Sequence, residues 1–439
     1  MKSHDVCVVG AGYVGLVTGS CLAEIGHRVV CVDSDPRKLK SLKAGKVPIH
    51  EPGLDALFKR VVKSGRLMFV SSVEEGLLHK GRRASVVFIA VGTPPRHDGS
   101  ADLSAVEHVA QTVAKHMRGY TVIVDKSTVP VETGDWVSKT IQRFNKTGNP
   151  YDVVSNPEFL SEGTAVHDFM KPDRVVLGVS SKRAETLMRE IYAPLKATML
   201  VTDLKSAELI KHASNSFLAT KISYINAVSA LCEKVGADVK LVAQGMGLDR
   251  RIGPMFLNAG IGFGGFCFPK DLEAFYWISK QKGYDFKLLK AVQEINELQL
   301  SWVARKIEEK LWNLEGKTVA VLGLAFKPHT DDMRYAPSLE VVTGLRARGV
   351  KVRAFDPVAM ERAKVLPEFK GVHFSHDEYD AIKGSDALAI VTEWPRFKDL
   401  DLRRVKKLMR TAVLLDGRNI FDPEKARALG FDYAGVGRP

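Results

Sequence analysis

Val8-Val9-Gly10-Ala11-Gly12-Tyr13-Val14-Gly15 sets a G-x-G-x-x-G pattern between a run of β-branched residues and a helical pattern. In such a turn, the first glycine permits the sharp bend and the second lets a pyrophosphate approach the backbone. The third allows the helix to pack closely on the strand, and the helix N-terminus faces the phosphates. A second strand pattern, at residues 29–32, is followed by Asp33, about 20 residues further along the chain. The stretch therefore predicts a dinucleotide-binding Rossmann unit.

The carboxylate at position 33 indicates NAD rather than NADP as the cofactor. Asp33 can accept hydrogen bonds from the ribose hydroxyls of adenosine, and it would repel a 2′-phosphate. Arg37, a little further on, could still tolerate a phosphate. A glycine turn without any ligand is the alternative, and the complete order of strand, turn, helix and carboxylate argues against it. We expect the cofactor to contact Gly10, Gly12, Tyr13, Val14, Gly15 and Asp33.

Strand–helix alternation at both ends of the chain predicts two α/β domains. Apolar runs without polar alternation are typical of parallel strands buried on both faces, and they occur at residues 6–9, 29–32, 86–91, 121–125, 153–155, 175–179, 318–322, 352–355, 387–391 and 412–415. Residues 207–235 instead have apolar side chains at helical spacing, with Asp203 or Ser206 as a candidate cap and Gly236 at the end. We predict two Rossmann-like doubly wound domains, residues 1–205 and 316–439, joined by a helical middle domain at 206–315 with a long central helix.

The composition is that of a globular protein with a basic excess. The 439 residues include 64 Lys and Arg against 51 Asp and Glu, a formal net charge of +13. This charge favours a polyanionic partner, which could be nucleic acid, an acidic membrane surface or a phosphorylated small molecule. No nucleic-acid-binding motif is found, and the longest apolar stretch, residues 86–91, is too short for a bilayer. We therefore expect a small-molecule partner, with neither nucleic acid nor a membrane, and no metal.

Five cysteines in so long a chain do not form a disulfide framework, and they fit a reducing, cytoplasmic setting. One of them, Cys267, lies in the glycine-dense stretch 260–271. Pro269 suits a first helical position, so Cys267 would lie just before a helix N-terminus, a placement that favours the nucleophilic thiolate. From these residues alone, a catalytic and a structural Cys267 are about equally probable.

Three further sites carry polar residues with two possible meanings. Lys211 and Asn215 share a helix face, where a lysine can extend to the surface or stabilise an oxyanion. Asn156 and Pro157 indicate a helix start, with Glu158 and Glu162 on one face, and either a simple helix-dipole preference or a carboxylate acting on water fits them. The turn 323–327, ending in Lys327, could bind a nucleotide or be purely structural.

Taken together, these motifs resemble those of the UDP-glucose 6-dehydrogenase family, within the wider nucleotide-sugar dehydrogenases, over essentially the whole chain. The stretches that carry the resemblance are Gly10–Gly15 with Asp33, Glu51–Leu54, Val91–Pro94, Lys126–Pro130, Asn156–Leu160, Lys211 with Asn215, Gly264–Asp271, Gly323–Lys327 and Asp416–Asn419. Several motifs of this length in one order are far more specific than the glycine fingerprint alone.

The resemblance implies a four-electron oxidation, in which a sugar C6 alcohol becomes a carboxylate and two NAD molecules are reduced in turn. Cys267 matches the cysteine that captures the aldehyde as a thiohemiacetal and then forms a thioester, which water hydrolyses. The match assigns Lys211 to stabilising the oxyanion, Asp271 to holding the catalytic water and lysine, and Glu158 to proton transfer. The residues that orient water and substrate match Thr128 and Asn215.

The same resemblance implies a set of ligand contacts and a homodimer or higher homo-oligomer. NAD contacts are implied for Asp33, Arg37, Thr93, Thr128, Glu162 and Arg334. Nucleotide-sugar contacts are implied for Glu158, Phe159, Leu160, Lys211, Asn215, Phe256, Leu257, Gly264, Lys327 and Arg418. Arg251 matches a residue that reaches the substrate of a neighbouring subunit, which implies at least a homodimer built on the long middle helix.

Two residues depart from the family pattern. Glu132 stands where members commonly carry glycine, and it adds negative charge near the expected cofactor edge. Phe266 stands where many members carry a small residue, and it could narrow the pocket. Neither change removes a residue that the chemistry needs.

The expected function is therefore the NAD-dependent oxidation of UDP-glucose to UDP-glucuronate. The same chemistry on GDP-mannose or a UDP-N-acetyl-hexosamine is the first alternative. A non-catalytic NAD- or nucleotide-sugar-binding regulator is an alternative of another class, and it would not need Cys267, Lys211 and Asp271 together, since binding alone needs no nucleophile.

Overall fold

The computed structural model describes residues 2–439, which form two compact units. Unit 1 comprises the chain up to Ser214 together with Glu273–Tyr284, and unit 2 comprises Asn215–Leu272 with Asp285–Pro439. The division falls within helices α9 (Leu204–Val235) and α11 (Cys267–Gln281), so each of these helices contributes residues to both units. Among residues 2–439, no helix is both long and apolar enough to cross a membrane.

Unit 1 contains an eight-stranded sheet in the order β10-β9-β8-β7-β6-β1-β2-β3. Its strands are β1 (Asp5–Val9), β2 (Arg28–Val32), β3 (Leu67–Val70), β6 (Val86–Ile89), β7 (Thr121–Asp125), β8 (Tyr151–Ser155), β9 (Val175–Val179) and β10 (Met199–Thr202). Val6 and Val8 belong to one buried cluster, whereas Cys7 and Val9 belong to another. Because alternate residues of a strand face opposite sides of the sheet, both faces are covered, as a doubly wound fold requires.

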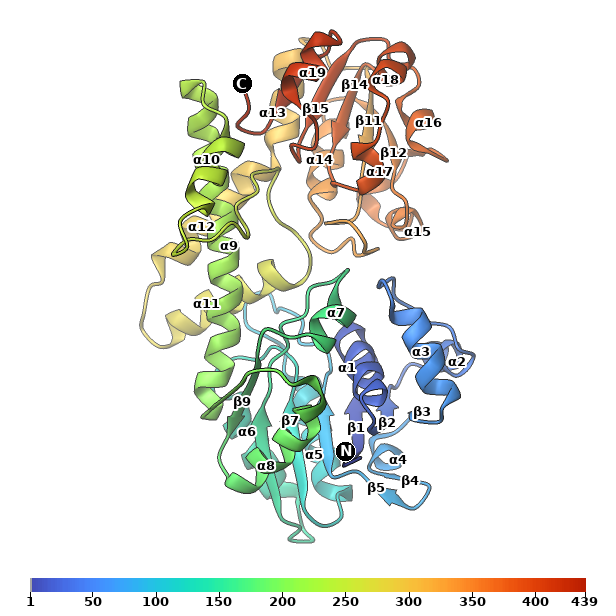
Figure 1. Cartoon of the computed structure of the whole chain (residues 1–439), viewed down its shortest axis with the longest axis vertical. Helices are drawn as coiled ribbons and strands as arrows, with labels where there is room; N and C mark the ends of the chain where they lie inside the picture. The colour runs from blue at the N-terminus through green and yellow to red at the C-terminus, as the bar shows by residue number, and fades with distance from the viewer. Residues whose placement is uncertain (1) are drawn as a thin grey trace. The chain divides into compact units, whose positions relative to one another are not determined.

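The helices that cover this sheet are α1 (Tyr13–Glu24), α2 (Pro36–Lys43), α3 (Leu54–Lys63), α4 (Val73–Leu77), α5 (Ser104–His116), α6 (Thr133–Phe144), α7 (Ala165–Met170) and α8 (Lys182–Tyr192), with a short 3₁₀ turn at Ala193–Leu195 (Figure 1). A small hairpin joins β4 (Leu78–His79) and β5 (Arg82–Arg83) outside the main sheet. The six strands predicted for this region are confirmed to within two residues at each end, and β3 and β10 were not predicted.

The expectation of an all-parallel sheet in this region is wrong at one pair. β9 pairs antiparallel with β8, although β10 pairs parallel with β9. A continuous apolar run reports burial on both faces and carries no information on the direction of the neighbouring strand. The sequence pattern therefore located β8 and β9 but could not orient them.

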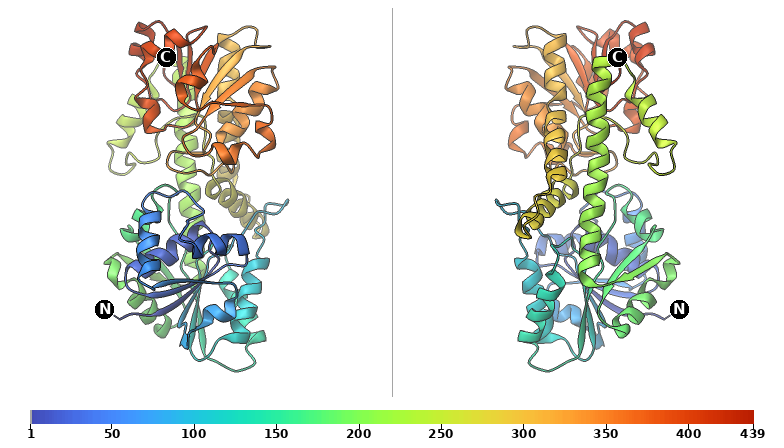
Figure 2. Two further views of the ribbon diagram at one scale, coloured as in Figure 1. Left: turned by 90° about the vertical axis from the view of Figure 1, so that its right-hand side faces the viewer. Right: turned by 90° about the vertical axis from the view of Figure 1, so that its left-hand side faces the viewer.

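The long central helix is confirmed as α9, Leu204–Val235, which has 32 residues and begins three residues before the predicted start. Asp203 caps it, because its carboxylate accepts hydrogen bonds from the Ser206 backbone N–H at 2.9 Å and the Ser206 hydroxyl at 2.6 Å. Figure 2 shows α9 as one unbroken helix. The other helices of the middle region are α10 (Val239–Gly247), α11, α12 (Lys287–Leu300) and α13 (Trp302–Lys310).

Unit 2 contains a second sheet, whose six strands all pair in parallel, in the order β13-β12-β11-β14-β15-β16. The strands are β11 (Thr318–Leu322), β12 (Lys351–Phe355), β13 (His373–Phe374), β14 (Ala387–Ile390), β15 (Val413–Asp416) and β16 (Asp432–Gly435). The main covering helices are α14 (Pro337–Arg346), α15 (Met360–Ala363), α16 (Glu378–Ile382), α17 (Pro395–Lys398), α18 (Leu402–Leu408) and α19 (Pro423–Ala428). The four strands predicted here are confirmed, and the fold is two Rossmann-like domains with a helical middle region.

Asp125, the last residue of β7, carries a carboxyl group that is buried in the fold. It is 1% exposed, and among residues 2–439 neither of its carboxyl oxygens has a hydrogen-bond partner. Burial, with a smaller contribution from the charge of Glu208, raises the pKa of Asp125 to about 8. The side chain is therefore neutral in the folded protein near pH 7.

We expect Asp125→Asn to raise the melting temperature by more at about pH 8 than at about pH 6. An unfolded chain loses the Asp125 proton near pH 4, whereas the folded chain keeps it up to about pH 8, so the free energy of unfolding falls as the pH rises between these values. The expected loss between about pH 6 and about pH 8 is roughly 2 kcal/mol, and asparagine does not titrate.

Thermal unfolding of both proteins at the two pH values tests this expectation. Asp55→Asn, at an exposed position of α3, is the control and should leave the pH dependence unchanged. A melting-temperature difference between Asp125→Asn and the parent chain that stays constant with pH would contradict it.

Candidate active site

The N-terminal glycine turn has the geometry of a dinucleotide cradle. Gly10 has a positive φ of 99°, its backbone N–H donates to the Val32 carbonyl at 2.8 Å, and a Cβ atom on it would lie 2.5 Å from the Ala90 carbonyl oxygen. A Cβ atom on Gly12, by contrast, would meet no atom within 4 Å. The turn is therefore tightly packed at Gly10, and there is free space at Gly12, over which a pyrophosphate would lie. The residues present fit NAD.

Asp33 is oriented by its neighbours in unit 1. Its carboxylate accepts hydrogen bonds from the Ala11 backbone N–H at 3.0 Å and the Asp35 backbone N–H at 3.0 Å, and it pairs with Lys38 Nζ at 2.7 Å. Lys38 was not predicted. A carboxylate offers about four acceptor positions, so Asp33 keeps capacity for a ribose hydroxyl. The Arg37 side chain is exposed to solvent, and its Nε lies 3.8 Å from the Asp35 carboxylate.

We expect Asp33→Ser to lower the preference for NAD over NADP by at least about tenfold. The substitution removes the charge that repels a 2′-phosphate, and Lys38 then lacks its partner and is available to the phosphate. The measurement is the ratio of kcat/KM for the two cofactors. The matched control is Asp35→Ser, which removes a neighbouring carboxylate that caps α2, and equal ratios for the two variants would contradict the role of Asp33.

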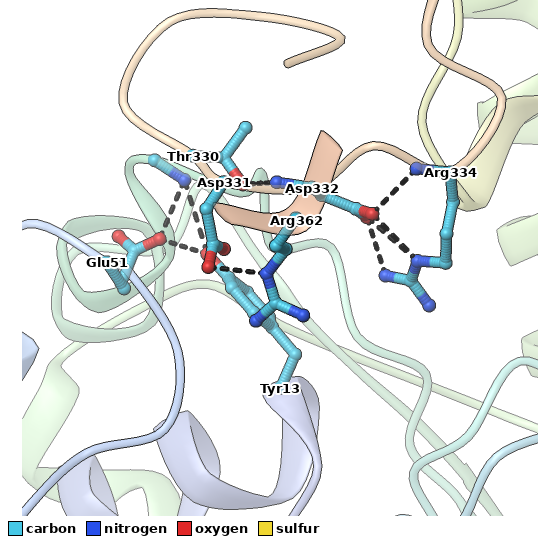
Figure 3. A network of polar contacts seen from close by, with 8 residues as sticks. Tyr13, Glu51, Thr330, Asp331, Asp332, Arg334 and Arg362 are labelled. Carbon is cyan, nitrogen blue, oxygen red and sulfur yellow. Dashed lines mark hydrogen bonds and ion pairs between the residues drawn. The ribbon is translucent and has the colours of Figure 1, made fainter. Parts of the chain in front are cut away.

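Glu51 contacts Tyr13, the first residue of α1 (Figure 3), and it also binds the backbone just after Glu162. Glu51 Oε2 accepts hydrogen bonds from the Tyr13 hydroxyl and from the Gly163 N–H, the latter at 2.6 Å. Its Oε1 accepts from the Ala165 N–H at 2.9 Å. Burial, then the bond to Glu51, raises the pKa of Tyr13, so the phenol stays a donor. Two predicted NAD contacts, Tyr13 and Glu162, are thus set by one buried carboxylate.

Lys211 and Glu158 form a buried ion pair in unit 1. Lys211 Nζ lies 2.9 Å from Glu158 Oε1, and the two side chains are only 4% and 6% exposed. The second oxygen of Glu158 accepts from the Leu160 N–H at 2.6 Å. Phe159 contacts two cations, with Lys211 Nζ 5.4 Å and the Arg174 guanidinium 3.7 Å from its ring centroid. A lysine that extends to the surface is excluded, and a buried cation beside a carboxylate is the arrangement that proton transfer at an oxyanion needs.

The predicted helix start at Asn156 and Pro157 is wrong. Residues 156–161 are a loop, and α7 begins only at Ala165, so Glu158 and Glu162 do not share a helix face. Asn156 is instead buried, and it accepts from Lys126 Nζ at 3.1 Å and the Tyr192 hydroxyl at 2.5 Å while donating to the Val176 carbonyl at 2.8 Å. These contacts anchor the residue from which the Glu158 loop leaves β8.

Thr93 and Thr128, both predicted NAD contacts, lie side by side. The Thr93 hydroxyl donates to the Thr128 carbonyl at 3.0 Å. Glu132, four residues on, adopts a positive φ of 80°, and its carboxylate pairs with Lys282 Nζ at 3.0 Å, with Lys205 Nζ at 3.9 Å. These lysines balance the extra negative charge that distinguishes Glu132 from the family's glycine.

Cys267 is the first residue of α11, and Pro269 is its third. The prediction that Cys267 would lie just before the helix, with Pro269 in the first position, is therefore wrong by two residues, although the cysteine remains at the helix N-terminus. It is half-buried, whereas the other four cysteines are buried. A nucleophile must be reachable, and Cys267 alone among the five meets that condition.

The glycine loop before Cys267 is held by hydrogen bonds within unit 2. Arg418 donates to the Gly262 carbonyl at 3.0 Å and to the Val391 carbonyl at 2.7 Å. Asn296 of α12 accepts from the Phe263 N–H at 2.8 Å. A Cβ atom on Gly264 would lie 2.0 Å from the Tyr335 carbonyl oxygen, so only glycine fits there. Arg418 and the glycine loop, predicted separately as substrate contacts, are thus brought together.

Asp271 and Asn215 also lie together in unit 2. Asn215 Nδ2 donates to Asp271 Oδ2 at 2.6 Å, and Lys270 Nζ lies 2.7 Å from Asp271 Oδ1. All three residues are buried. Lys270 was not predicted, because a lysine next to an aspartate in sequence gives no sign that both are inside.

Phe266 supports Arg334, a predicted NAD contact. The Arg334 guanidinium lies 4.2 Å from the Phe266 ring centroid and makes a bidentate pair with Asp332, at 2.9 Å and 2.6 Å (Figure 3). Lys327 follows β11 as predicted, with Nζ 5.4 Å from the Phe326 ring centroid. The aromatic residue before the cysteine therefore acts as a platform for a cation.

Three further predicted substrate contacts belong to unit 2. Arg251 is exposed and pairs with Asp249 at 2.6 Å. Phe256 has a positive φ of 65°, with its ring 6.3 Å from Phe268. Leu257 is buried in the core cluster that includes Val319 and Val321.

The turn at Gly323 has the same backbone arrangement as the turn at Gly10, but the carboxylate beside it has no free acceptor position for a ligand. Its N–H donates to the Phe355 carbonyl at 2.9 Å, as Gly10 does to Val32, and Asp356 follows β12 as Asp33 follows β2. Asp356 is 1% exposed and accepts from the N–H groups of Leu324, Ala325, Val358 and Ala359 and from Trp394 Nε1. Five donors exceed the roughly four acceptor positions of a carboxylate, so Asp356 is a structural residue.

Comparisons with known proteins place these features in a family context. Three models of the UDP-glucose/GDP-mannose dehydrogenase family match: the NAD binding domain at residues 4–196, the central domain at 205–298 and the UDP binding domain at 320–423. UDP-glucose 6-dehydrogenase TuaD of Bacillus subtilis (strain 168) is 47% identical over 435 residues, covering 99% of this chain and 93% of the relative.

Two solved structures share the architecture over the whole chain. A UDP-glucose dehydrogenase from the hyperthermophilic archaeon Pyrobaculum islandicum has a TM-score of 0.92 at 40% identity, covering 100% of this chain and 98% of that one. A UDP-D-ManNAc dehydrogenase from Pyrococcus horikoshii has a TM-score of 0.86 at 28% identity, covering 100% and 99%.

Proposed function

Because this chain belongs to the UDP-glucose/GDP-mannose dehydrogenase family, we propose that it is an NAD-dependent enzyme that oxidises the C6 alcohol of UDP-glucose to the carboxylate of UDP-glucuronate. The observation that carries the catalytic part is Cys267, the one cysteine of the five that is not buried, at the start of α11. Bound NAD supplies the hydride acceptor for both oxidations. Gly10, Gly12, Gly15 and Asp33 would hold it, and Tyr13, Val14, Thr93, Thr128, Glu162 and Arg334 would complete its contacts.

The role we assign to Cys267 is to keep the aldehyde bound between the two oxidations. Its thiolate adds to the aldehyde carbon and forms a thiohemiacetal, and loss of the hydride from that carbon leaves a thioester. Water then adds to the thioester, which releases the carboxylate and restores the thiol. Covalent capture prevents escape of a reactive intermediate.

The remaining roles follow from charge and proton supply. Lys211 stabilises the oxygen that becomes negative in each tetrahedral intermediate. Glu158, paired with it at 2.9 Å, takes or returns the proton. Asp271 holds the attacking water, and Asn215 orients Asp271 through their 2.6 Å hydrogen bond. Thr128 helps to orient water and substrate, and the proposed sugar-nucleotide contacts are Phe159, Leu160, Phe256, Leu257, Gly264, Lys327 and Arg418.

The proposal includes a division of labour along the chain and a homo-oligomer. Residues 1–205 would bind NAD, 316–439 the nucleotide sugar, and 206–315 would carry the catalytic lysine and join subunits. Exposed apolar side chains on α9 and after α10, among them Phe217 at 65% and Leu248 at 81%, support an interface there. Arg251 would reach the partner's substrate. Free cysteines throughout support a reducing, cytoplasmic setting.

The experiment that tests the proposed function is mass identification of the product formed from UDP-glucose and NAD, together with the ratio of NADH to product. We expect UDP-glucuronate and a ratio near two, as a four-electron oxidation requires. A panel containing GDP-mannose and UDP-N-acetyl-hexosamines decides between the alternatives, and a clear preference for either would overturn the choice of UDP-glucose. Absence of any NADH formation across the panel would favour a non-catalytic binding protein.

A further inference from the structure

Two buried polar side chains of α9 hold the segment that follows Thr128. Glu208 and His212 lie one helical turn apart and are 3% and 1% exposed. His212 Nε2 lies 2.8 Å from the Val129 carbonyl oxygen, and because a carbonyl only accepts, the ring nitrogen donates. Glu208 accepts from the Glu132 N–H and the Gly134 N–H, each at 2.7 Å. We call Glu208 and His212 the α9 clamp.

The clamp is matched to the backbone that it holds. Helix α6 begins at Thr133, so the two N–H groups that Glu208 binds are among those that a helix N-terminus leaves without intrahelical partners. A carboxylate is the favoured group there, because the helix dipole is positive at that end. A Cβ atom on Gly134 would lie 3.4 Å from Glu208 Oε1, so this position packs directly against the carboxylate.

The two residues joined by the His212–Val129 hydrogen bond each lie next to a residue of the proposed active site. Val129 directly follows Thr128, whose carbonyl accepts a hydrogen bond from the Thr93 hydroxyl. His212 directly follows Lys211, which pairs with Glu158. The His212 ring also packs on Phe275 of α11, with ring centroids 5.7 Å apart. The clamp therefore connects the strip of chain at the expected cofactor edge to the helix that carries the catalytic lysine.

We propose that Glu208 and His212 are positioning residues that fix Thr128 relative to Lys211 and so set the use of NAD. This inference rests on the proposed function. Each side chain acts through the backbone that it binds, His212 through the Val129 carbonyl and Glu208 through the N–H groups of Glu132 and Gly134. Buried polar groups specify one arrangement of packed segments because any other leaves them unpaired. Displacement of a reacting group by about 1 Å can cost on the order of 100-fold in rate.

The test compares His212→Phe, which keeps a ring against Phe275 but removes the donor, with His212→Gln, whose amide N–H can reach the same carbonyl. We expect His212→Phe to lower kcat/KM for NAD by about 10- to 100-fold, with KM for UDP-glucose unchanged. His212→Gln should recover most of the loss. Glu208→Gln, which keeps one carbonyl acceptor, should show the same split between the two substrates in a weaker form.

Ser223→Ala is the matched control, since it removes another buried hydrogen bond from α9, that of the Ser223 hydroxyl to the Val292 carbonyl at 2.8 Å. It should lower the melting temperature without changing KM for NAD. If His212→Phe lowers only the melting temperature, or raises both KM values together, the positioning role is wrong. Fluorescence titration measures NADH affinity without turnover, and His212→Phe should bind NADH more weakly than the parent chain. A parent chain that fails to oxidise UDP-glucose would overturn the proposed function. The comparison of NADH affinities would still test the α9 clamp in that case.

Discussion

Cys267→Ser is expected to reduce net formation of UDP-glucuronate by roughly 10³-fold or more, with binding of NAD and UDP-glucose retained. Serine is close in size, so the start of α11 and the glycine loop should keep their shape. Its hydroxyl ionises far less readily than a thiol, so capture of the aldehyde is lost. Product formation by mass spectrometry and nucleotide affinity by calorimetry are the two measurements.

Cys232→Ala supplies the matched control for this variant. Cys232 is a buried residue of α9, and its replacement should cost stability but leave the NADH-to-product ratio and the turnover number near those of the parent chain. Near-normal turnover by Cys267→Ser would remove the nucleophile assignment. A release of free aldehyde in that variant, trapped with a hydrazine, would support the assignment directly.

Lys211→Met is expected to lower kcat by about 10²- to 10³-fold, because it removes the cation that we propose stabilises the oxyanion. It should also destabilise the folded chain by about 3–5 kcal/mol, since Glu158 is left as a buried carboxylate without its partner. Methionine keeps most of the length of the lysine stem, so packing against Phe159 changes little. Steady-state kinetics and thermal unfolding measure the two effects.

The double variant Lys211→Met with Glu158→Gln separates the two effects. A neutral glutamine no longer needs a counter-charge, so we expect most of the stability to return while kcat stays low. If activity returned along with stability, the lysine would serve only to balance the buried charge. If Lys211→Met kept its activity, the assignment of Lys211 to stabilising the oxyanion would be wrong.

What the sequence could predict was local or periodic. The first glycine turn was predictable because strand, turn, helix and carboxylate follow one another within a short span, and α9 was predictable because 32 residues repeat a helical pattern. β13 was missed because two residues are too few for any period to stand out. β3 was missed because Leu67–Val70 holds a single β-branched residue, unlike the equally short β6. At Asn156, an asparagine–proline pair that suits a helix start belongs to a loop, because three buried partners hold the side chain.

Motifs predicted most of the candidate residues, and two kinds of contact were missed. Glu208 and His212 bind backbone groups up to 83 positions away, which their own sequence neighbourhood does not reveal. Lys38 and Lys270 pair with the nearby Asp33 and Asp271, but a lysine close to an aspartate in sequence gives no sign that the pair is held inside the fold. A charged or imidazole side chain within the apolar stripe of α9 was the one available sign, because such a group must find a partner when buried. The length of the chain and its charge of +13 were compatible with many functions and selected none.

The two glycine turns also determine how many dinucleotides a chain can hold. The second turn is filled from within: a Cβ atom on Gly323 would lie 2.4 Å from Thr392, and Asp356 has no acceptor left for a ribose. A chain with two Rossmann-like sheets thus has a binding stoichiometry of one NAD rather than two. If one chain oxidises each sugar twice and Cys267 holds the sugar covalently, as we propose, the reduced cofactor must leave the site before the second NAD binds. The covalent intermediate would then have to last longer than the exchange of cofactor.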